Sequence, residues 1–168
     1  MLFRSVFSVG RQLTTIDKSG IRFQVPMESD AEIIRIVPQV QAKRVAVVQE
    51  DGTVSLRDLA SLEPIARQRR TGRLTAAAPL PWLGEQRLLL ATHEGPIHCV
   101  GLEDELVTQY MSSHRGVRAV SAAADLIAGV SSDRQRVILW NSWDGKAPLA
   151  EVSIASATRH RVGDIDFA

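Results

Sequence analysis

The chain has 168 residues, of which 20 are Lys or Arg, 19 are Asp or Glu and one is Cys, a length that suits one domain with a buried core. The formal net charge of +1 gives no general attraction to nucleic acid or to acidic membranes, and the lone Cys99 excludes an internal disulfide and a multi-cysteine zinc site. Because the sequence lacks both a long apolar run and the basic start of a signal peptide, we expect a cytoplasmic protein that does not contact a membrane.

Short runs rich in Val, Ile, Leu and Thr follow one another along the chain, with turn residues between them and almost no helical periodicity. From the N-terminus, paired runs of this kind cover residues 12–25, 45–56, 88–100 and 126–140. Glu50-Asp51-Gly52 joins the second pair, and Asp-Gly between two β-rich runs indicates a hairpin because both residues tolerate positive φ. The pattern predicts an all-β chain of antiparallel hairpins.

The four hairpins form a repeat when they are aligned on the acidic residue of each turn. These residues are Asp17, Asp51, Glu94 and Asp133, separated by 34, 43 and 39 positions. Two positions earlier stand Thr15, Gln49, Thr92 and Ser131. The strand after each turn reaches Gln24, Arg57, Val100 and Trp140. A period of about 40 residues with several short strands per unit is typical of propeller blades.

The strands that follow these turns also carry a family resemblance. Residues 51–59 read Asp-Gly-Thr-Val-Ser-Leu-Arg-Asp-Leu, and residues 137–141 read Val-Ile-Leu-Trp-Asn after Ser-Ser-Asp. Both segments resemble the end of a WD repeat, although Arg57 replaces the usual Trp and Asn141 the usual Asp. Residues 5–13 resemble the opening of such a repeat, and residues 160–167 resemble the start of a further one.

The resemblance implies a single β-propeller segment over residues 1–168. It has about four four-stranded antiparallel blades, near residues 2–30, 31–70, 71–113 and 114–157, with a tail strand at residues 158–168. An open arc of blades exposes apolar flanks and strand edges, so we expect the segment to be part of a longer protein or to be completed by another chain or a second copy. A tail that pairs with the first blade and closes a small four-bladed ring is the alternative.

One set of residues in the fourth blade invites a catalytic interpretation. The residues are His114, Ser131, Asp133 and Trp140. Ser131 lacks the Gly-x-Ser-x-Gly elbow of a hydrolase. In WD repeats a His before the blade, a Ser or Thr, a turn Asp and the Trp indole are joined by hydrogen bonds, so the resemblance implies a structural tetrad. In the second blade we expect Arg57, which replaces the Trp, to keep its charged head in water.

A second cluster raises the question of a metal site. It contains His93, Glu94, His98 and Cys99. Adjacent residues of a strand point to opposite faces, so His98 and Cys99 do not easily share one ion. We expect Cys99 to be a buried core thiol, and we expect no metal, no cofactor and no catalytic residue.

The candidate partner contacts are a basic run and one tryptophan. The run contains Arg67, Arg69, Arg70 and Arg73, in the link between the second and third blades. A solvated loop is the default interpretation, and contact with a partner or a phosphate is the alternative because guanidinium groups bind such anions well. No aromatic residue interleaves the run, which disfavours single-stranded nucleic acid. Trp143 follows the third strand of the fourth blade, where turn residues are exposed.

The resemblance implies a non-catalytic platform that presents loops to a protein partner. From the charge balance we expect no binding of nucleic acid. The alternative is a sensor or regulatory propeller within a larger signalling enzyme whose catalytic domain lies elsewhere, and a small propeller enzyme or lectin is a third reading. We expect the tail, with Val162, Ile165 and Phe167 as apolar contacts, to pair with another strand, because a lone strand cannot satisfy its backbone in water.

Overall fold

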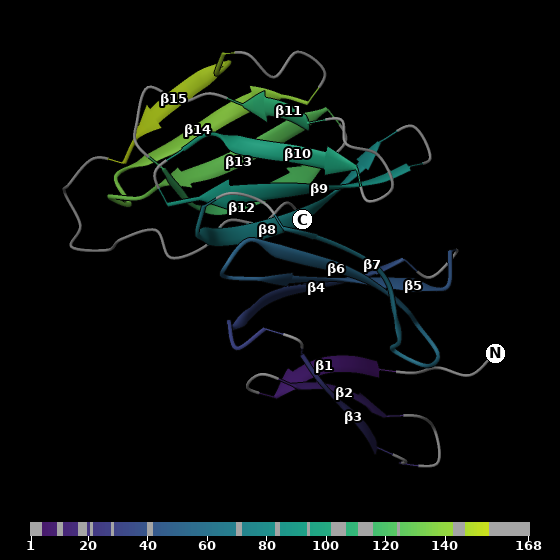
Figure 1. Ribbon diagram of the computed structural model, residues 1–168. Helices are drawn as coiled ribbons and strands as arrows, with labels where there is room; N and C mark the ends of the chain where they lie inside the picture. Colours follow the sequence, from purple (N-terminus) through teal and green to yellow (C-terminus); the bar gives the residue numbers. More distant parts are fainter. Residues whose placement is uncertain are drawn as a thin grey trace. The chain divides into compact units, whose positions relative to one another are not determined.

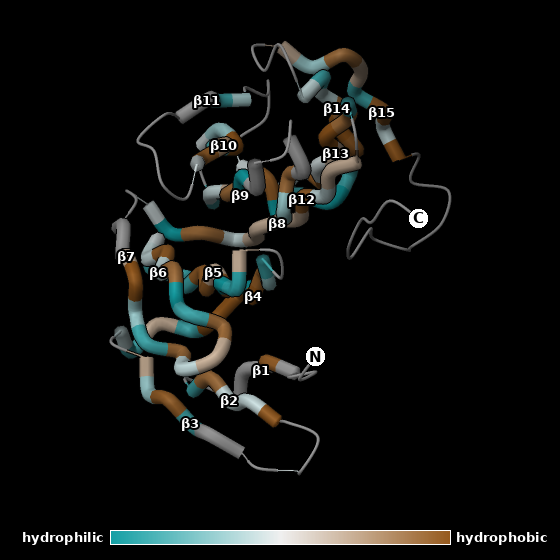
Figure 2. Tube along the Cα trace, turned by 90° about the vertical axis from the view of Figure 1, so that its right-hand side faces the viewer, coloured by the Kyte–Doolittle hydropathy of each residue, from teal (hydrophilic) through white to brown (hydrophobic). Residues whose placement is uncertain are grey.

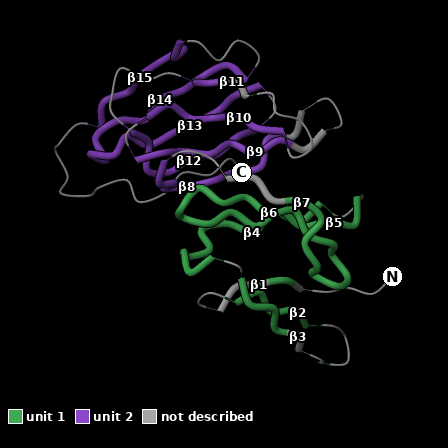
Figure 3. Tube along the Cα trace, in the orientation of Figure 1, with its two compact units in different colours: residues 1–71 green, residues 72–168 purple. Residues whose placement is uncertain are grey.

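All regular secondary structure in the described part of the chain is β-strand, which confirms the all-β prediction (Figure 1). The computed structural model describes residues 5–9, 12–16, 20, 22–27, 29–39, 42–69, 72–82, 85–93, 95–101, 107–110, 116–123, 125–142 and 147–154. Across these ranges no helix is long and apolar enough to cross a membrane. The chain divides into two compact units, residues 1–71 and residues 72–168 (Figure 3).

Unit 1 contains two antiparallel sheets. The first has three described strands in the order β1 (Ser5–Val9), β2 (Gln12–Ile16) and β3 (Arg22–Pro26). The second has four in the order β4 (Ile33–Gln39), β5 (Arg44–Gln49), β6 (Thr53–Asp58) and β7 (Pro64–Arg69). Leu13 of the first sheet packs with Val45 and Val47 of the second and with Leu62 of the loop between β6 and β7, and all four are buried. This apolar layer holds the two sheets together.

Unit 2 repeats the plan with two four-stranded sheets. The third sheet has the order β8 (Leu74–Trp82), β9 (Glu85–Thr92), β10 (Ile97–Gly101) and β11 (Val107–Tyr110). The fourth has the order β12 (Val117–Ala123), β13 (Leu126–Ser131), β14 (Arg136–Asn141) and β15 (Ala150–Ser153). Leu89 and Ile97 of the third sheet share a buried cluster with Ile127 and Trp140 of the fourth. The colouring of Figure 2 shows apolar segments along β13 and β14.

The first strand of every four-stranded sheet contains the same irregularity. The pairs before it are Ile33 with Gln49, Leu74 with Thr92, and Val117 with Ser131. After each pair the first strand has one extra residue: Ile34, Thr75 and Arg118. Such β-bulges are specific features of a strand pair. Their common position confirms that Gln49, Thr92 and Ser131 are equivalent.

The alignment of the first sheet is different. Thr15 pairs with Phe23 and shares a sheet face with Leu13, which packs on the second sheet. Gln49 shares a face of the second sheet with Val47, which packs on the first sheet. Thr15 therefore faces the sheet that follows its own, whereas Gln49 faces the sheet that precedes its own. The equivalence of Thr15 with Gln49 is therefore wrong, because residues that differ by one strand position lie on opposite faces.

The strands of the four sheets lie within the four predicted blade ranges, from Ser5 to Pro26, Ile33 to Arg69, Leu74 to Tyr110 and Val117 to Ser153. The assignment of residues 1–168 to one domain stays a prediction. The tail at residues 158–168, with Val162, Ile165 and Phe167, lies outside the described residues.

Candidate interaction surface

Ser131 and Asp133 form a hydrogen-bonded turn at the end of β13. The Ser131 hydroxyl donates to Oδ1 of Asp133 at 2.5 Å, and the backbone N–H of Gln135 donates to the same oxygen at 2.9 Å. The Ser131 hydroxyl oxygen also accepts the backbone N–H of Arg136 at 3.1 Å. Ser131 is buried, so these bonds satisfy a polar group that water does not reach. The arrangement ties the turn to the start of β14.

Trp140 is fully buried on β14, in the core between the third and fourth sheets. Gly129 on β13 leaves room for the indole: a Cβ added there would lie 2.9 Å from Cζ3 of Trp140 and 3.0 Å from Cγ1 of Val117. His114 lies outside the described residues, so the complete tetrad stays a prediction. Ser131 and Asp133 are the pair that the structure brings into contact.

A second polar network, which sequence reasoning missed, lies at the turn between β5 and β6. The Ser29 hydroxyl donates to Oδ2 of Asp51 at 2.8 Å, and the backbone N–H of Thr53 donates to Oδ1 at 2.9 Å. Nε2 of Gln49 donates to the carbonyls of Ser29 and Ala31 at 3.2 and 3.0 Å. The alignment of Asp51 with Asp133 was the one sequence feature that could have indicated this network. It did not reach Ser29, which lies 22 residues before Asp51.

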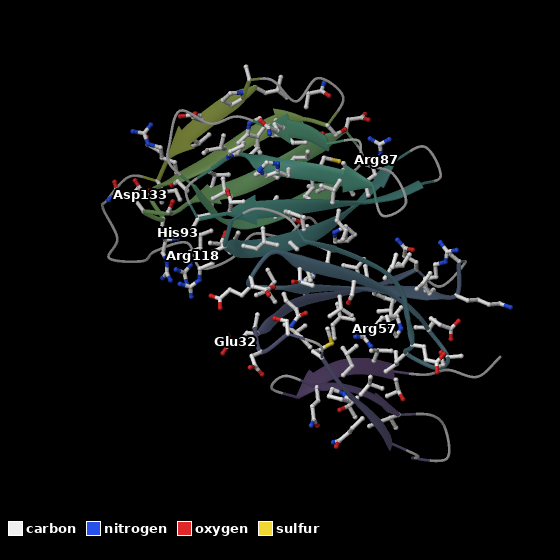
Figure 4. All side chains as sticks on the ribbon, in the orientation of Figure 1. Glu32, Arg57, Arg87, His93, Arg118 and Asp133 are labelled. Atoms are coloured by element: carbon white, nitrogen blue, oxygen red, sulfur yellow. The ribbon has the colours of Figure 1, made fainter. Side chains whose placement is uncertain are left out.

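Arg57 does not keep its charged head in water, and that expectation is wrong. The residue is 2% exposed, and its Nη1 donates to the carbonyl of Leu62 at 2.8 Å (Figure 4). Leu62 has a positive φ of 60°, and its N–H donates to the carbonyl of Asp58 at 2.9 Å. The loop between β6 and β7 thus turns a carbonyl toward the guanidinium, which a sequence pattern does not reveal.

Tyr110 links the third sheet to the fourth. Its hydroxyl donates to the carbonyl of Ser142 at 2.7 Å, and both residues are buried. Burial raises the pKa of Tyr110 to about 12, with a further contribution from Cys99 that Arg87 partly offsets. The predicted burial of Cys99 is confirmed, since 2% of the residue is exposed. Sequence reasoning missed Tyr110 because the bond joins residues that are 32 positions apart.

The residues considered as metal ligands are dispersed. His93 is exposed after β9, and His98 is half-buried on β10. Glu94 lies outside the described residues. Where the structure is described, it contains no group of three or more His, Cys, Asp or Glu residues that could hold a metal ion.

The predicted partner contacts have different positions. Arg67 and Arg69 belong to strand β7, which corrects their assignment to a link between blades. Arg73 is exposed directly before β8, and its carbonyl accepts the N–H of His93 at 3.1 Å. Arg70 and Trp143 lie outside the described residues. Contact between any of these side chains and a partner stays a prediction.

Comparisons with known proteins bear on the fold. No family model matches the chain, and no curated protein matches it. The structure is similar to the crystal structure of Chaetomium thermophilum Raptor, a propeller-containing protein, with a TM-score of 0.73 and 15% sequence identity. The chain has the fold of a β-propeller segment.

The match to Raptor covers 94% of this chain and 16% of the Raptor chain, so this propeller segment spans a small part of that protein. A likeness at 15% identity shows the fold alone. Because 874 solved chains match this propeller segment, the fold does not single out one function.

Proposed function

We propose that the chain is a WD-repeat-type propeller segment that acts as a non-catalytic platform for a protein partner. The observation that carries this proposal is the pair of turn networks. The hydroxyls of Ser131 and Ser29 donate to the carboxylates of Asp133 and Asp51, and both carboxylates also accept backbone N–H groups. Side chains that could serve a reaction are thereby used to hold the turns rigid. Rigid turns between strands are suited to binding, because little conformational entropy is lost when a partner docks.

The chemistry of Ser131 supports the same proposal. A nucleophilic serine needs an exposed hydroxyl and an adjacent base that takes its proton. Ser131 is 1% exposed, its hydroxyl donates to Asp133, and its oxygen accepts the Arg136 N–H. This geometry favours a structural role over nucleophilic attack.

Cross-linking in the native extract tests the platform function. The full chain is compared with Arg73→Glu and with the control Arg35→Glu, which reverses an exposed charge on β4 of unit 1. A platform yields a reproducible cross-linked partner with the unaltered chain and with Arg35→Glu, and a loss in Arg73→Glu places the contact near β8. A hydrolytic or transfer activity that His114→Ala abolishes while the melting temperature is unchanged overturns the proposal.

A specific observation also favours assembly with a second copy. In the third sheet Ile97 pairs with Tyr110, and in the fourth sheet Val137 pairs with Val152, so Tyr110 and Val152 are equivalent. Tyr110 is 1% exposed because the fourth sheet packs over it, whereas Val152 is 55% exposed. We propose that a sheet of a second copy covers this outer face of the fourth sheet. The mass of the unaltered chain in solution, compared with that of Val152→Asp, tests this assembly.

The sensor function within a larger signalling enzyme stays the alternative proposal. The match to a small part of a much longer chain is compatible with it. The complete gene decides between the two: a catalytic domain on the same chain favours the sensor, and a short gene favours the separate platform.

A further inference from the structure

One end of unit 2 gathers basic side chains from separate segments of the chain. Arg73 precedes β8, His93 follows β9, Arg118 lies on β12 and Arg134 lies in the turn before β14. The backbone N–H of His93 donates to the carbonyl of Arg73 at 3.1 Å, which joins the first two segments. Figure 4 shows His93, Arg118 and Asp133 at the same end of the unit.

Gly116 brings the other two segments to this end. Its φ is +71°, and a Cβ added there would lie 1.9 Å from the carbonyl oxygen of His93 and 2.9 Å from Oγ of Ser132. The backbone at Gly116 is therefore packed between the turn after β9 and the turn after β13. Arg118 follows Gly116 by two residues, and Arg134 follows Ser132 by two. Two residues span only a short length of chain, so the backbone of both arginines lies near His93.

Arg118 occupies a position where the fold does not require a charge. It is the extra residue of the β12 bulge, and the equivalent residues are Ile34 and Thr75. Thr75 uses this position to contact the next sheet, since its hydroxyl donates to the carbonyl of Val117 at 2.5 Å. Arg118 is exposed, and among the described residues its guanidinium has no hydrogen bond or ion pair. The five N–H donors of this guanidinium are therefore available to an acceptor outside the chain.

The charge at this end is unbalanced. The described residues contribute Arg73, Arg118 and Arg134 against Asp133, while Arg136 at the start of β14 is paired with Glu151 at 3.8 Å. Oδ1 of Asp133 already accepts the Ser131 hydroxyl and the Gln135 N–H. Guanidinium groups bind carboxylates through paired, charge-assisted hydrogen bonds. The cluster is thus suited to a short anionic segment.

We propose that Arg73, His93, Arg118 and Arg134 form a docking site for an acidic peptide segment of the partner. This inference rests on the proposed platform function and names the chemistry of what the platform binds. A peptide is favoured over a nucleic acid because the net charge of +1 gives no extended basic track, and none of the four residues is a Phe, Tyr or Trp, the large rings on which successive bases stack.

Fluorescence anisotropy of the full chain tests the docking site. The probe is a fluorescein-labelled decapeptide of alternating Glu and Ser, measured at low salt. We expect Arg118→Glu to weaken binding about tenfold and Arg118→Gln about threefold, since each step removes charge-assisted bonds. The control Arg35→Glu makes the same charge reversal at an exposed site on β4 and is expected to change binding less than about twofold.

Arg134→Asn is a second variant that keeps the fold intact, because Asn tolerates the positive φ of 61° at this position. It is expected to weaken the peptide about threefold. Equal losses in Arg118→Glu and Arg35→Glu, or no measurable binding, overturn the docking site. Tighter binding of a ten-nucleotide oligo(dT), lost in Arg118→Glu, also overturns it in favour of nucleic acid.

The cross-linking experiment separates this inference from the platform function. If the chain with Arg118→Glu keeps the cross-linked partner, the platform stands and the acidic docking site is wrong. If the unaltered chain yields no partner, the platform function itself is wrong. Loss of the partner in Arg118→Glu but not in Arg35→Glu supports both.

Discussion

Arg57 and Trp140 occupy equivalent strand positions with opposite chemistry. Arg57 pairs with Val45 and Trp140 with Ile127, and all four residues are buried. The indole contributes a large apolar surface, whereas the guanidinium needs an acceptor in the core. The carbonyl of Leu62 supplies that acceptor at 2.8 Å. One position in the blade thus accepts two long side chains, and for Arg57 the loop between β6 and β7 supplies the acceptor.

Trp140→Ala is expected to reduce the free energy of unfolding by about 3–5 kcal/mol. The change removes a fully buried aromatic side chain between the third and fourth sheets and leaves a cavity. Chemical denaturation measures the loss. Leu149→Ala is the control, because Leu149 is 60% exposed, and its effect should stay within about 0.5 kcal/mol. Equal losses from the two variants contradict the core role of Trp140.

Arg57→Ala is expected to reduce the free energy of unfolding by about 2–5 kcal/mol, because it empties a buried site and leaves the Leu62 carbonyl without this donor. Arg57→Met fills the space without supplying a donor, so its loss should be smaller. Urea denaturation of both variants checks this order. If neither change affects stability, Arg57 is exposed in solution, and the buried placement is wrong.

Local spacing made some residues predictable and left others hidden. The resemblance to a WD repeat implied the contact between Ser131 and Asp133, which lie two positions apart. Burial of Cys99 followed from the alternation of its strand. The partners of Arg57 and Tyr110 depend on how loops return to the sheets, and the Tyr110 bond to Ser142 spans 32 residues. A periodic sequence pattern does not predict where a loop packs against a sheet.

At the scale of elements, the hydrogen bond from Tyr110 of β11 to Ser142 after β14 can be tested by titrating the tyrosine hydroxyl. Tyr110 is the one tyrosine of the chain, so absorbance at the phenolate band reports it alone. We expect half-ionisation at a pH of about 12 in the folded protein, against the ordinary value of 10.0, because burial disfavours the phenolate. A midpoint near 10 before unfolding contradicts the buried placement.

The same raised pKa makes stability depend on pH. Above pH 10 the unfolded chain loses the Tyr110 proton while the folded chain keeps it. Folding stability from this group is therefore complete below pH 10 and falls by up to about 1.4 kcal/mol per pH unit until pH 12. Tyr110→Phe should remove this part of the decline, and urea titrations at fixed pH values measure the difference.

Gly116 fixes how the turns of the third and fourth sheets meet. Gly116→Ala is expected to cost more than about 1 kcal/mol, because it combines a positive φ with a Cβ that would collide with the His93 carbonyl. Gly72→Ala is a matched control: φ is +96° there, but no atom lies within 4 Å of the added Cβ. Thermal melting compares the two. Equal losses show that strain alone matters and that the turns are not in contact.

Hairpins were the most predictable elements. Asp51-Gly52 and the alternating runs beside it located β5 and β6, because turn chemistry and side-chain alternation act within a few residues. The alignment of Thr15 with Gln49 was wrong by one position, because the length of a turn does not determine which face the last residue of the preceding strand occupies.

At the scale of the whole molecule, the outer face of the fourth sheet gives a test of assembly. If a second copy covers it, Val152→Asp places a charge in that interface and should shift the mass toward the 18.4 kDa of one chain. Light scattering after size exclusion measures the mass. Ile65→Asp on β7 is the control, with Ile65 50% exposed. An unaltered chain that is already a monomer at micromolar concentration contradicts the assembly.

The repeat of the second, third and fourth sheets was predictable, but the division into two units was not. Equivalent bulges confirm the repeat of the last three sheets, and the sequence showed its period through Asp51, Glu94 and Asp133. The boundary between units falls at Thr71 and Gly72, within a segment where composition does not change. The boundary between the two units depends on contacts between sheets, which cannot be inferred from a single sequence.

The bulge in the first strand of each four-stranded sheet has a consequence for how the repeats diverge. A bulged residue stands outside the ladder of paired positions, so its replacement alters no register and no hairpin. An apolar, a hydroxyl and a cationic side chain have accumulated there as Ile34, Thr75 and Arg118. Where the bulged side chain is exposed and makes no contact with the next sheet in the described part of the chain, as at Arg118, replacement can change the surface of the blade edge at little cost to folding.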